Sequence, residues 1–280
     1  MRRSPARRLA ALLLAALLAA LLVGPATPAA AAPPPLPNRM ASLGDSITRG
    51  YNACGWYVDC PSRSWSTGSY SSVNSHYLRL LARNPALGGY NYNDAKTGAK
   101  MSALSTQVSY AVSQRADYVT ILLGANDACT SSESTMTSVS SFTSSLQSGL
   151  DALKAGRPTA SVLVVSIPDI KRLWYIGKDS WAARTAWSTY GICQSMLKNP
   201  TSTSSTDAAR RDRVRQRVID YNTALANACA AYGPNCRFDA NAVFDYPFVF
   251  SQVSTWDYFH PNTSGQAALA RVTWDAGFGW

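Results

Sequence analysis

The chain has 280 residues, of which 26 are basic and 16 are acidic, and a formal net charge of +10. Its two histidines exclude a three-histidine zinc site. Because no module combining aromatic and basic residues accompanies its arginines, nucleic-acid binding is not predicted. After a leader of about 32 residues, the remaining length suits one domain with a sizeable core, and we expect a monomer.

The N-terminus has the composition of a secretory signal peptide. A basic stretch, an apolar run and small residues follow one another: Arg2, Arg3, Arg7, Arg8, then Leu9–Val23, then Ala29–Ala32. The apolar run is short for a membrane span, which needs about 20 residues. We expect a signal peptide over residues 1–32, a secreted protein, and one domain over residues 33–280 with a net charge of +6 (22 basic, 16 acidic).

Short apolar runs alternate with helical patterns along the domain. We expect strands at Arg39–Leu43, Tyr90–Asp94, Tyr118–Leu123, Ser161–Ile167 and Arg237–Phe238, and helices at Val73–Ala82, Ser102–Val112, Ser138–Leu153, Ser205–Ala231 and Ser264–Trp274. This alternation predicts an α/β fold whose parallel sheet is covered on both faces. In such sheets, ligands bind beyond the carboxyl ends of the strands.

A basic cluster lies within the long helix expected at Ser205–Ala231: Arg210, Arg211, Arg213, Arg215 and Arg217. Helical spacing predicts a buried stripe of Val214, Val218, Tyr221 and Leu225, with the arginines pointing outward. We expect a solvated helix face. Transient attraction to an anionic lipid surface is the alternative.

Six cysteines in a secreted chain imply disulfides, although six allow fifteen pairings. Cys54 is close to Cys60 in sequence, and Cys229 is close to Cys236. Local pairing would leave Cys129 with Cys193. The chain contains no CxxC pair, which disfavours metal binding by these cysteines.

A candidate nucleophile follows the first expected strand. Gly44 permits a tight backbone path, and the turn after it would present the hydroxyl of Ser46 to solvent. The start of the next segment can direct N–H groups at an oxyanion. By itself, Gly-Asp-Ser is also compatible with a simple turn or a helix cap.

A candidate base lies near the end of the chain. Asp257 precedes His260 by three residues, so on a tight turn its carboxylate can reach the imidazole Nδ1–H and fix the tautomer. The alternative for this pair is a loop with a helix cap. The other histidine, His76, lies in a helical pattern, and we expect it to be a packing or surface residue.

Candidate oxyanion donors follow two other strands. The Asn126 side chain comes just after the strongest apolar strand, and the Gly98 backbone N–H follows the second strand. Glycine and asparagine are also favoured in plain turns. Together, four features follow successive strands in one order: Gly-Asp-Ser, Gly98, Gly-Ala-Asn-Asp, and Asp257 with His260.

In this order the chain resembles the GDSL/SGNH hydrolase family, and the match runs from residue 44 to residue 260. The resemblance implies a flavodoxin-like three-layer α/β/α fold and metal-free ester hydrolysis without a cofactor. It assigns Ser46 as nucleophile, His260 as base and Asp257 as the residue that orients it. The N–H groups of Ser46 and Gly98 and the Nδ2 of Asn126 would form the oxyanion hole. Lys96 stands where the family often has asparagine, and some members orient the base with a backbone carbonyl.

The pattern, with six cysteines, is similar to secreted bacterial lipases and phospholipases A1 of this family, so a lipid-type ester is the expected substrate. Aromatic residues in expected loops could line a cleft for an acyl chain: Trp56, Tyr57, Trp174, Tyr175, Trp181, Trp187 and Tyr246–Phe250. Polysaccharide deacetylation by the same machinery is one alternative. A non-catalytic carbohydrate- or surface-binding module is another.

Overall fold

The computed structural model describes residues 33–280, so the predicted signal peptide lies outside the described residues. Five strands form one parallel sheet in the order β2-β1-β3-β4-β5: β1 Met40–Gly44, β2 Asn91–Asn93, β3 Tyr118–Leu122, β4 Ser161–Val164 and β5 Cys236–Phe238. Each overlaps a strand predicted from the sequence. This order confirms the predicted flavodoxin-like fold, in which the strand order reverses between β1 and β3.

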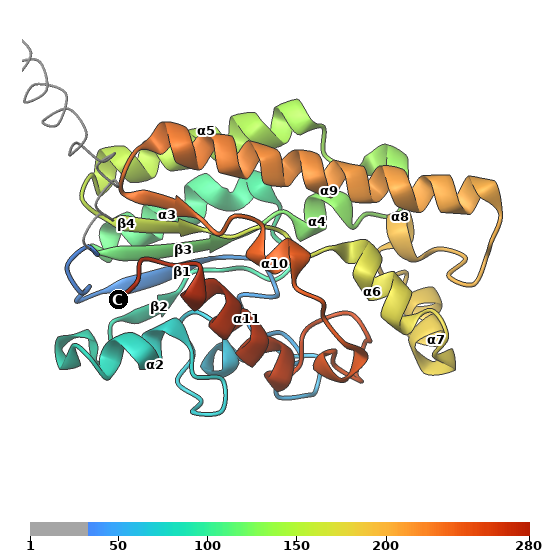
Figure 1. The fold of residues 1–280 in the computed structure, drawn as a ribbon, viewed down its shortest axis with the longest axis horizontal. Helices are drawn as coiled ribbons and strands as arrows, with labels where there is room; N and C mark the ends of the chain where they lie inside the picture. Colours follow the sequence, from blue (N-terminus) through green and yellow to red (C-terminus); the bar gives the residue numbers. More distant parts are fainter. Residues whose placement is uncertain (1–32) are drawn as a thin grey trace, which may run out of the picture. The chain divides into compact units, whose positions relative to one another are not determined.

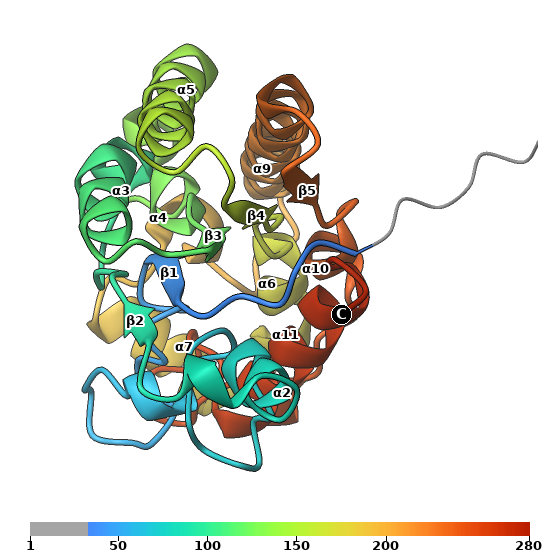
Figure 2. The same cartoon turned by 90° about the vertical axis from the view of Figure 1, so that its left-hand side faces the viewer.

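Helices cover both faces of the sheet, as Figures 1 and 2 show. Their bounds are α2 His76–Leu81, α3 Leu104–Ser113, α4 Ala125–Ala128, α5 Val139–Gly156, α6 Ile170–Gly177, α7 Trp181–Thr189, α8 Gln194–Leu197, α9 Ser205–Tyr232, α10 Ala242–Asp245 and α11 Thr263–Asp275. Helices α3, α5 and α9 lie on one face, and α2 and α11 lie on the other (Figure 2). This arrangement gives the three layers that the resemblance implied.

The alternation of side chains along the strands divides the interior into two cores. Ala41 and Leu43 of β1 belong to the core beneath α3, α5 and α9. Met40, the first residue of β1, points to the opposite face and belongs to the core shared with α2 and α11. Since both faces are covered, β1, β3 and β4 are buried at every position. No helix among residues 33–280 is long and apolar enough to cross a membrane.

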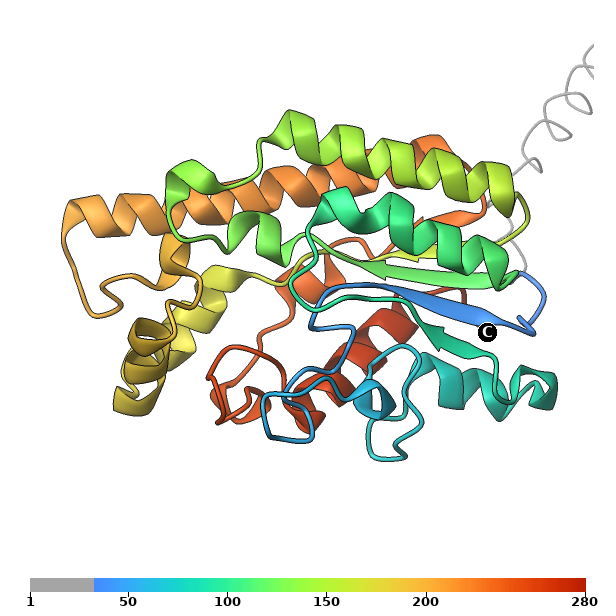
Figure 3. The same ribbon diagram turned by 180° about the vertical axis from the view of Figure 1, so that it is seen from behind.

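Two helices, α6 and α7, occupy a region that the sequence pattern suggested was loop. Each is capped by a side chain: Asp169 accepts from the Lys171 N–H, and Ser180 accepts from the Ala183 N–H. Both helices lie beyond one end of the sheet beside the loop that precedes α11 (Figure 3). The Trp187 indole donates to the Tyr258 carbonyl at 2.9 Å across this contact. Short helices give weak periodicity, and tertiary contacts of this kind stabilise them.

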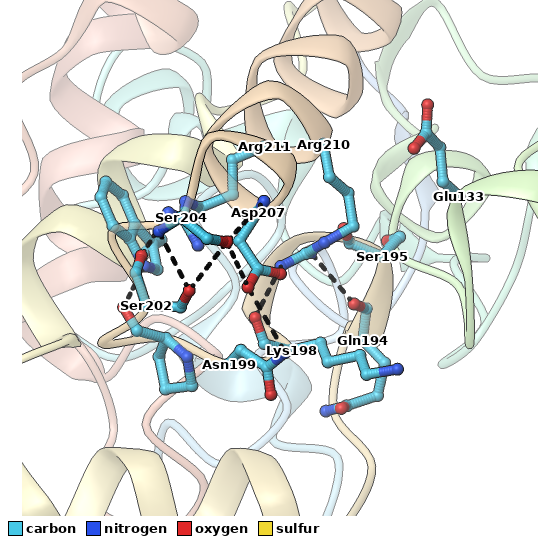
Figure 4. A network of polar contacts seen from close by, with 12 residues as sticks. Glu133, Gln194, Ser195, Lys198, Asn199, Ser202, Ser204, Asp207, Arg210 and Arg211 are labelled. Carbon is cyan, nitrogen blue, oxygen red and sulfur yellow. Dashed lines mark hydrogen bonds and ion pairs between the residues drawn. The ribbon is translucent and has the colours of Figure 1, made fainter.

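The buried stripe predicted for α9 is confirmed, because Val214, Val218, Tyr221 and Leu225 are all buried. The expectation that its arginines form a solvated face is met only in part, since Arg213 is exposed. Arg211 is buried, with its guanidinium 4.4 Å from the centre of the Trp174 ring. Arg210 donates to carbonyl oxygens of the segment around α8 (Figure 4).

The other three arginines of α9 are also engaged. Arg213 pairs with Glu133 at 2.6 Å, and Arg215 pairs with Asp169 at 2.7 Å. Arg217 donates to the Thr137 carbonyl at 2.7 Å. The guanidinium fork provides several donors in a fixed plane, which suits such bonds to oxygen atoms. These contacts disfavour the helix as a cationic patch for anionic lipid.

The six cysteines are joined in three disulfides: Cys54–Cys60, Cys129–Cys193 and Cys229–Cys236. The middle pair closes the longest loop, with a sequence separation of 64 residues, and links α4 to the start of α8. The third pair has a separation of 7 residues and connects α9 to β5. A crosslink restricts the unfolded chain more when the loop it closes is longer.

We therefore expect Cys129→Ser/Cys193→Ser to lower the free energy of unfolding by about 4 kcal/mol. The matched double variant Cys229→Ser/Cys236→Ser should lower it by about 2.4 kcal/mol, because its loop is short. Urea unfolding of the oxidised proteins measures both values. Equal losses would contradict the loop-length argument.

Candidate active site

The turn after β1 brings Ser46 to the carboxyl edge of the sheet. A side chain at Gly44 would place its Cβ 2.5 Å from the Leu122 carbonyl, so only glycine fits between the strands there. The side chain of Gln107 in α3 fixes this position with two hydrogen bonds. Its Oε1 accepts from the Gly44 N–H at 2.7 Å, and its Nε2 donates to the Gly44 carbonyl at 2.8 Å. The chain then turns, since the Tyr51 N–H donates to the Ser46 carbonyl.

The structure brings Ser46, His260 and Asp257 together. The Ser46 Oγ lies 2.8 Å from the His260 Nε2, and the His260 Nδ1 lies 2.5 Å from the Asp257 Oδ2. The other carboxylate oxygen of Asp257 accepts from the backbone N–H groups of Phe259 and His260, at 3.0 and 3.1 Å. The three-residue spacing thus forms the tight turn that was predicted, and a carboxylate, not a carbonyl, contacts the imidazole.

Asn52 is a fourth member of this arrangement, and sequence analysis missed it. Its Nδ2 donates to the Asp257 Oδ2 at 2.7 Å, and its side chain is buried. Burial alone would raise the pKa of the Asp257 carboxyl. Hydrogen bonds from His260 and two backbone N–H groups, with the nearby imidazole charge, nevertheless hold that pKa below its usual value. Asn52 adopts a left-handed backbone conformation, with φ +62, which asparagine tolerates. This conformational preference was the only local feature that distinguished the residue.

The candidate oxyanion donors face the same cavity as Ser46. Ser46, Gly98, Asn126 and His260 all line a cavity of about 520 Å³. The Asn126 Nδ2 donates one hydrogen to the Ala99 carbonyl at 3.0 Å, which fixes the amide and leaves its second N–H for another acceptor. Among the described residues, neither the Ser46 N–H nor the Gly98 N–H donates to a protein group. Three residues that line the cavity therefore keep an N–H without a protein acceptor among the described residues.

A model of the GDSL-like lipase/acylhydrolase family matches residues 40–272. The chain belongs to this family. Its members are carboxylic ester hydrolases, which agrees with the hydrogen-bonded serine, histidine and aspartate of this GDSL-family chain.

Relatives of the GDSL-family chain are distant. Membrane-associated phospholipase B1 of Rattus norvegicus is 28% identical over an alignment of 170 residues that covers 48% of this chain and only 12% of the relative. Among solved structures, a GDSL-like lipase from Parabacteroides merdae has a TM-score of 0.53 at 16% identity, covering 85% of this chain and 94% of its own. An acetyl-xylooligosaccharide esterase from Geobacillus, solved as a mutant, has a TM-score of 0.51 at 16% identity, covering 86% and 94%. These likenesses establish the fold.

A second, narrow groove adjoins the cavity of this GDSL-family chain. It has a free volume of about 80 Å³ and shares Phe259 and His260 with the larger cavity. Its walls come from α6 and from the loop before α11, and most of its lining is aliphatic or aromatic: Ile47, Ala125, Ile170, Leu173, Ile176, Phe248 and Val253. Of the aromatic residues singled out in the sequence, Tyr57 lines the cavity, Phe248 lines the groove, and Trp187 is a buried core residue.

The other histidine of the chain is remote from this site. His76 is buried between Tyr118 and Thr273, with both ring nitrogens in 2.8 Å hydrogen bonds to their hydroxyls. Burial lowers its pKa to about 3, so the ring stays neutral. His76 is a packing residue, one of the two roles expected from its sequence pattern.

Asp45 is a buried carboxylate beside the candidate nucleophile. Its Oδ1 accepts from the Ile47 N–H at 2.9 Å, but its Oδ2 is buried without a hydrogen-bond partner in the described part of the chain. Burial raises its pKa from 3.8 to about 7, although the Ile47 N–H opposes this. The folded state therefore favours the protonated carboxyl.

A raised carboxyl pKa contributes stability that is complete below about pH 4 and is lost as the pH rises through about 7. Asp45→Asn cannot ionise. We expect its free energy of unfolding, relative to wild type, to rise from about pH 4 to about pH 8. Urea unfolding across this range measures the difference, with exposed Asp179→Asn as the control. A difference for Asp45→Asn that does not change with pH would contradict the expectation.

Proposed function

We propose that the chain is a secreted serine esterase that hydrolyses lipid-type carboxylic esters through an acyl-serine intermediate. The observation that carries the proposal is the continuous hydrogen-bonded series from the Ser46 Oγ through the His260 ring to the Asp257 carboxylate. Nucleophile, base and orienting acid in this order define serine hydrolases on several unrelated folds. Family membership makes the ester bond the natural target.

In the proposed reaction, the His260 Nε2 removes the hydroxyl proton as the Ser46 Oγ attacks the ester carbonyl carbon. The carbonyl oxygen becomes an oxyanion, which the N–H groups of Ser46, Gly98 and Asn126 stabilise. The bond to the alcohol oxygen then breaks, and His260 returns its proton to the departing alcohol. Water repeats the sequence on the acyl-serine and releases the acid, which leaves Ser46 free.

Ser46→Ala and His260→Ala should each lower kcat by about 10⁶, because the serine, histidine and aspartate act as one catalytic unit and each variant removes one of them. Asn126→Ala should lower kcat by about 10²–10³ with little change in KM, because its amide acts on charge that develops in the transition state. Hydrolysis of p-nitrophenyl butyrate measures all three, with exposed Ser140→Ala as the control. Near-equal rates for wild type and both triad variants would refute the catalytic assignment.

The narrow groove supports an acyl chain as one half of the substrate. His260 lies in its lining, which is mainly aliphatic and aromatic apart from Asp169, Arg172 and Gln252, and its small free volume suits an alkyl chain better than a sugar ring. In this proposal the acyl chain lies in the groove beside α6, and the alcohol portion lies in the more open cavity. This favours lipid-type esters over acetylated polysaccharides.

A larger side chain in the groove should shift the enzyme's preference toward esters with shorter acyl chains. We expect Leu173→Trp to lower kcat/KM for octanoyl esters about tenfold or more while leaving acetyl esters nearly unchanged, since only the longer chain reaches the new ring. Tyr175→Trp, an exposed position on the same helix, is the control. A p-nitrophenyl ester series from acetate to palmitate gives the profile. A wild-type preference for acetate, with acetate release from acetylated xylan, would instead favour the deacetylase.

Three disulfides support the proposed secretion, because such bonds persist in oxidising compartments. Clustering of Pro34–Trp280 as one compact unit supports one hydrolase domain after the signal peptide. With the arginines of α9 engaged in internal contacts, the proposed lipid specificity rests on the groove, not on a cationic helix.

A further inference from the structure

Four exposed aromatic side chains gather at the mouth of the cavity, and we name Trp56, Tyr57, Tyr190 and Trp256 the aromatic rim. Their exposed fractions are 76%, 43%, 60% and 39%. The ring of Trp256 lies 5.5 Å from those of Trp56 and Tyr57, and the Tyr57 ring lies 6.1 Å from that of Tyr190. The rim is therefore one contiguous surface assembled from three distant segments of the chain.

The backbone holds this surface in place at a cost. Trp56 and Tyr57 both adopt left-handed conformations, with φ +72 and +51, which bulky residues rarely occupy. The Cys54–Cys60 disulfide closes the loop that carries them. The Tyr57 hydroxyl donates to the Trp256 carbonyl at 2.6 Å and ties this loop to the segment before Asp257. The loop thus presents two large aromatic rings outward instead of burying them.

Apart from the buried Asp257, the residues next to the rim side chains are uncharged, and the nearby Asp59 of the Trp56 loop is paired with Arg49 at 3.0 Å. Gly55–Val58, Ser188–Ile192 and Val253–Trp256 contain no acidic or basic residue. Tyr57 and Tyr190 also line the cavity with Ser46, so the rim is continuous with the proposed ester site. Tryptophan and tyrosine favour the boundary between apolar and aqueous phases, because each ring is apolar with one polar group. An uncharged partner with such a boundary matches this surface.

We propose that the aromatic rim attaches the protein to the lipid–water interface of neutral or zwitterionic lipids, with Trp56 as the principal inserting side chain. This inference rests on the proposed lipid-ester function and adds the surface by which aggregated substrate is reached. Attachment places the cavity mouth at the interface, so a lipid ester passes from the aggregate to Ser46 beside Tyr57 and Tyr190.

Binding is tested without turnover in the secreted Ser46→Ala protein, from which residues 1–32 have been removed, by sedimentation with phosphatidylcholine vesicles. We expect this protein to bind, and Trp56→Ala in the same background to weaken partitioning roughly tenfold. Trp181→Ala is the matched control: Trp181 is 74% exposed on α7 and makes no ring contact with the rim among the described residues. Failure of the Ser46→Ala protein to bind vesicles, or equal losses for Trp56→Ala and Trp181→Ala, would overturn the proposal.

Kinetics on catalytically intact protein separate this inference from the proposed function. Trp56→Ala should reduce hydrolysis of phosphatidylcholine vesicles at least fivefold more than hydrolysis of monomeric p-nitrophenyl butyrate. Equal effects on both substrates would refute interfacial attachment while leaving the esterase assignment intact. No hydrolysis of the monomeric ester by wild type would refute the proposed function itself. Loss of binding to insoluble acetylated xylan, with vesicle binding unchanged, would reassign the rim to a polysaccharide.

Discussion

The geometry of the candidate active site depends on the buried carboxylate of Asp257, which accepts four hydrogen bonds. One oxygen receives the His260 ring and the Asn52 side chain, and the other receives two backbone N–H groups of its own turn. Through these bonds the loop after β1 and the loop before α11 hold each other, although Asn52 and Asp257 are 205 residues apart. The imidazole can meet Ser46 only because both loops lie at the carboxyl edge of one parallel sheet.

The contrast between Asp257 and Asp45 shows that hydrogen-bond partners, not burial, decide charge in this site. Both carboxyl groups are almost fully buried. Asp257 has four donors and a lowered pKa, whereas Asp45 has one backbone donor and an unpartnered oxygen, and its pKa is raised to about 7. Burial raises the pKa of both groups, and only at Asp257 do hydrogen bonds outweigh this effect. The Asp257 carboxylate is thus ionised, while Asp45, next to Ser46 in the chain, retains a proton more readily.

Features that depend on local pattern could be predicted from the sequence, and features that depend on distant contacts could not. The five strands, the long helix α9 and the pairing of Asp257 with His260 follow from apolar runs and short spacings. Asn52 had no such signal, because its partner is far away in sequence. The arginines of α9 were misjudged for the same reason: helical periodicity shows which residues face the core, but not that Glu133, Asp169 and carbonyl oxygens from other segments meet the opposite face.

The distribution of charge and aromatic surface bears on how a substrate would reach Ser46. A cationic helix would attract any polyanion, but on α9 the charges of Arg213 and Arg215 are paired with the carboxylates of Glu133 and Asp169, and Arg211 is buried. The aromatic rim needs no such exchange, since its rings are already exposed. The strained backbone at Trp56 and Tyr57 would be a disadvantage in a purely structural loop, where a smaller residue would cost less. Contact of this loop with the lipid–water interface would explain its backbone strain, the exposure of its rings and its position at the cavity mouth together.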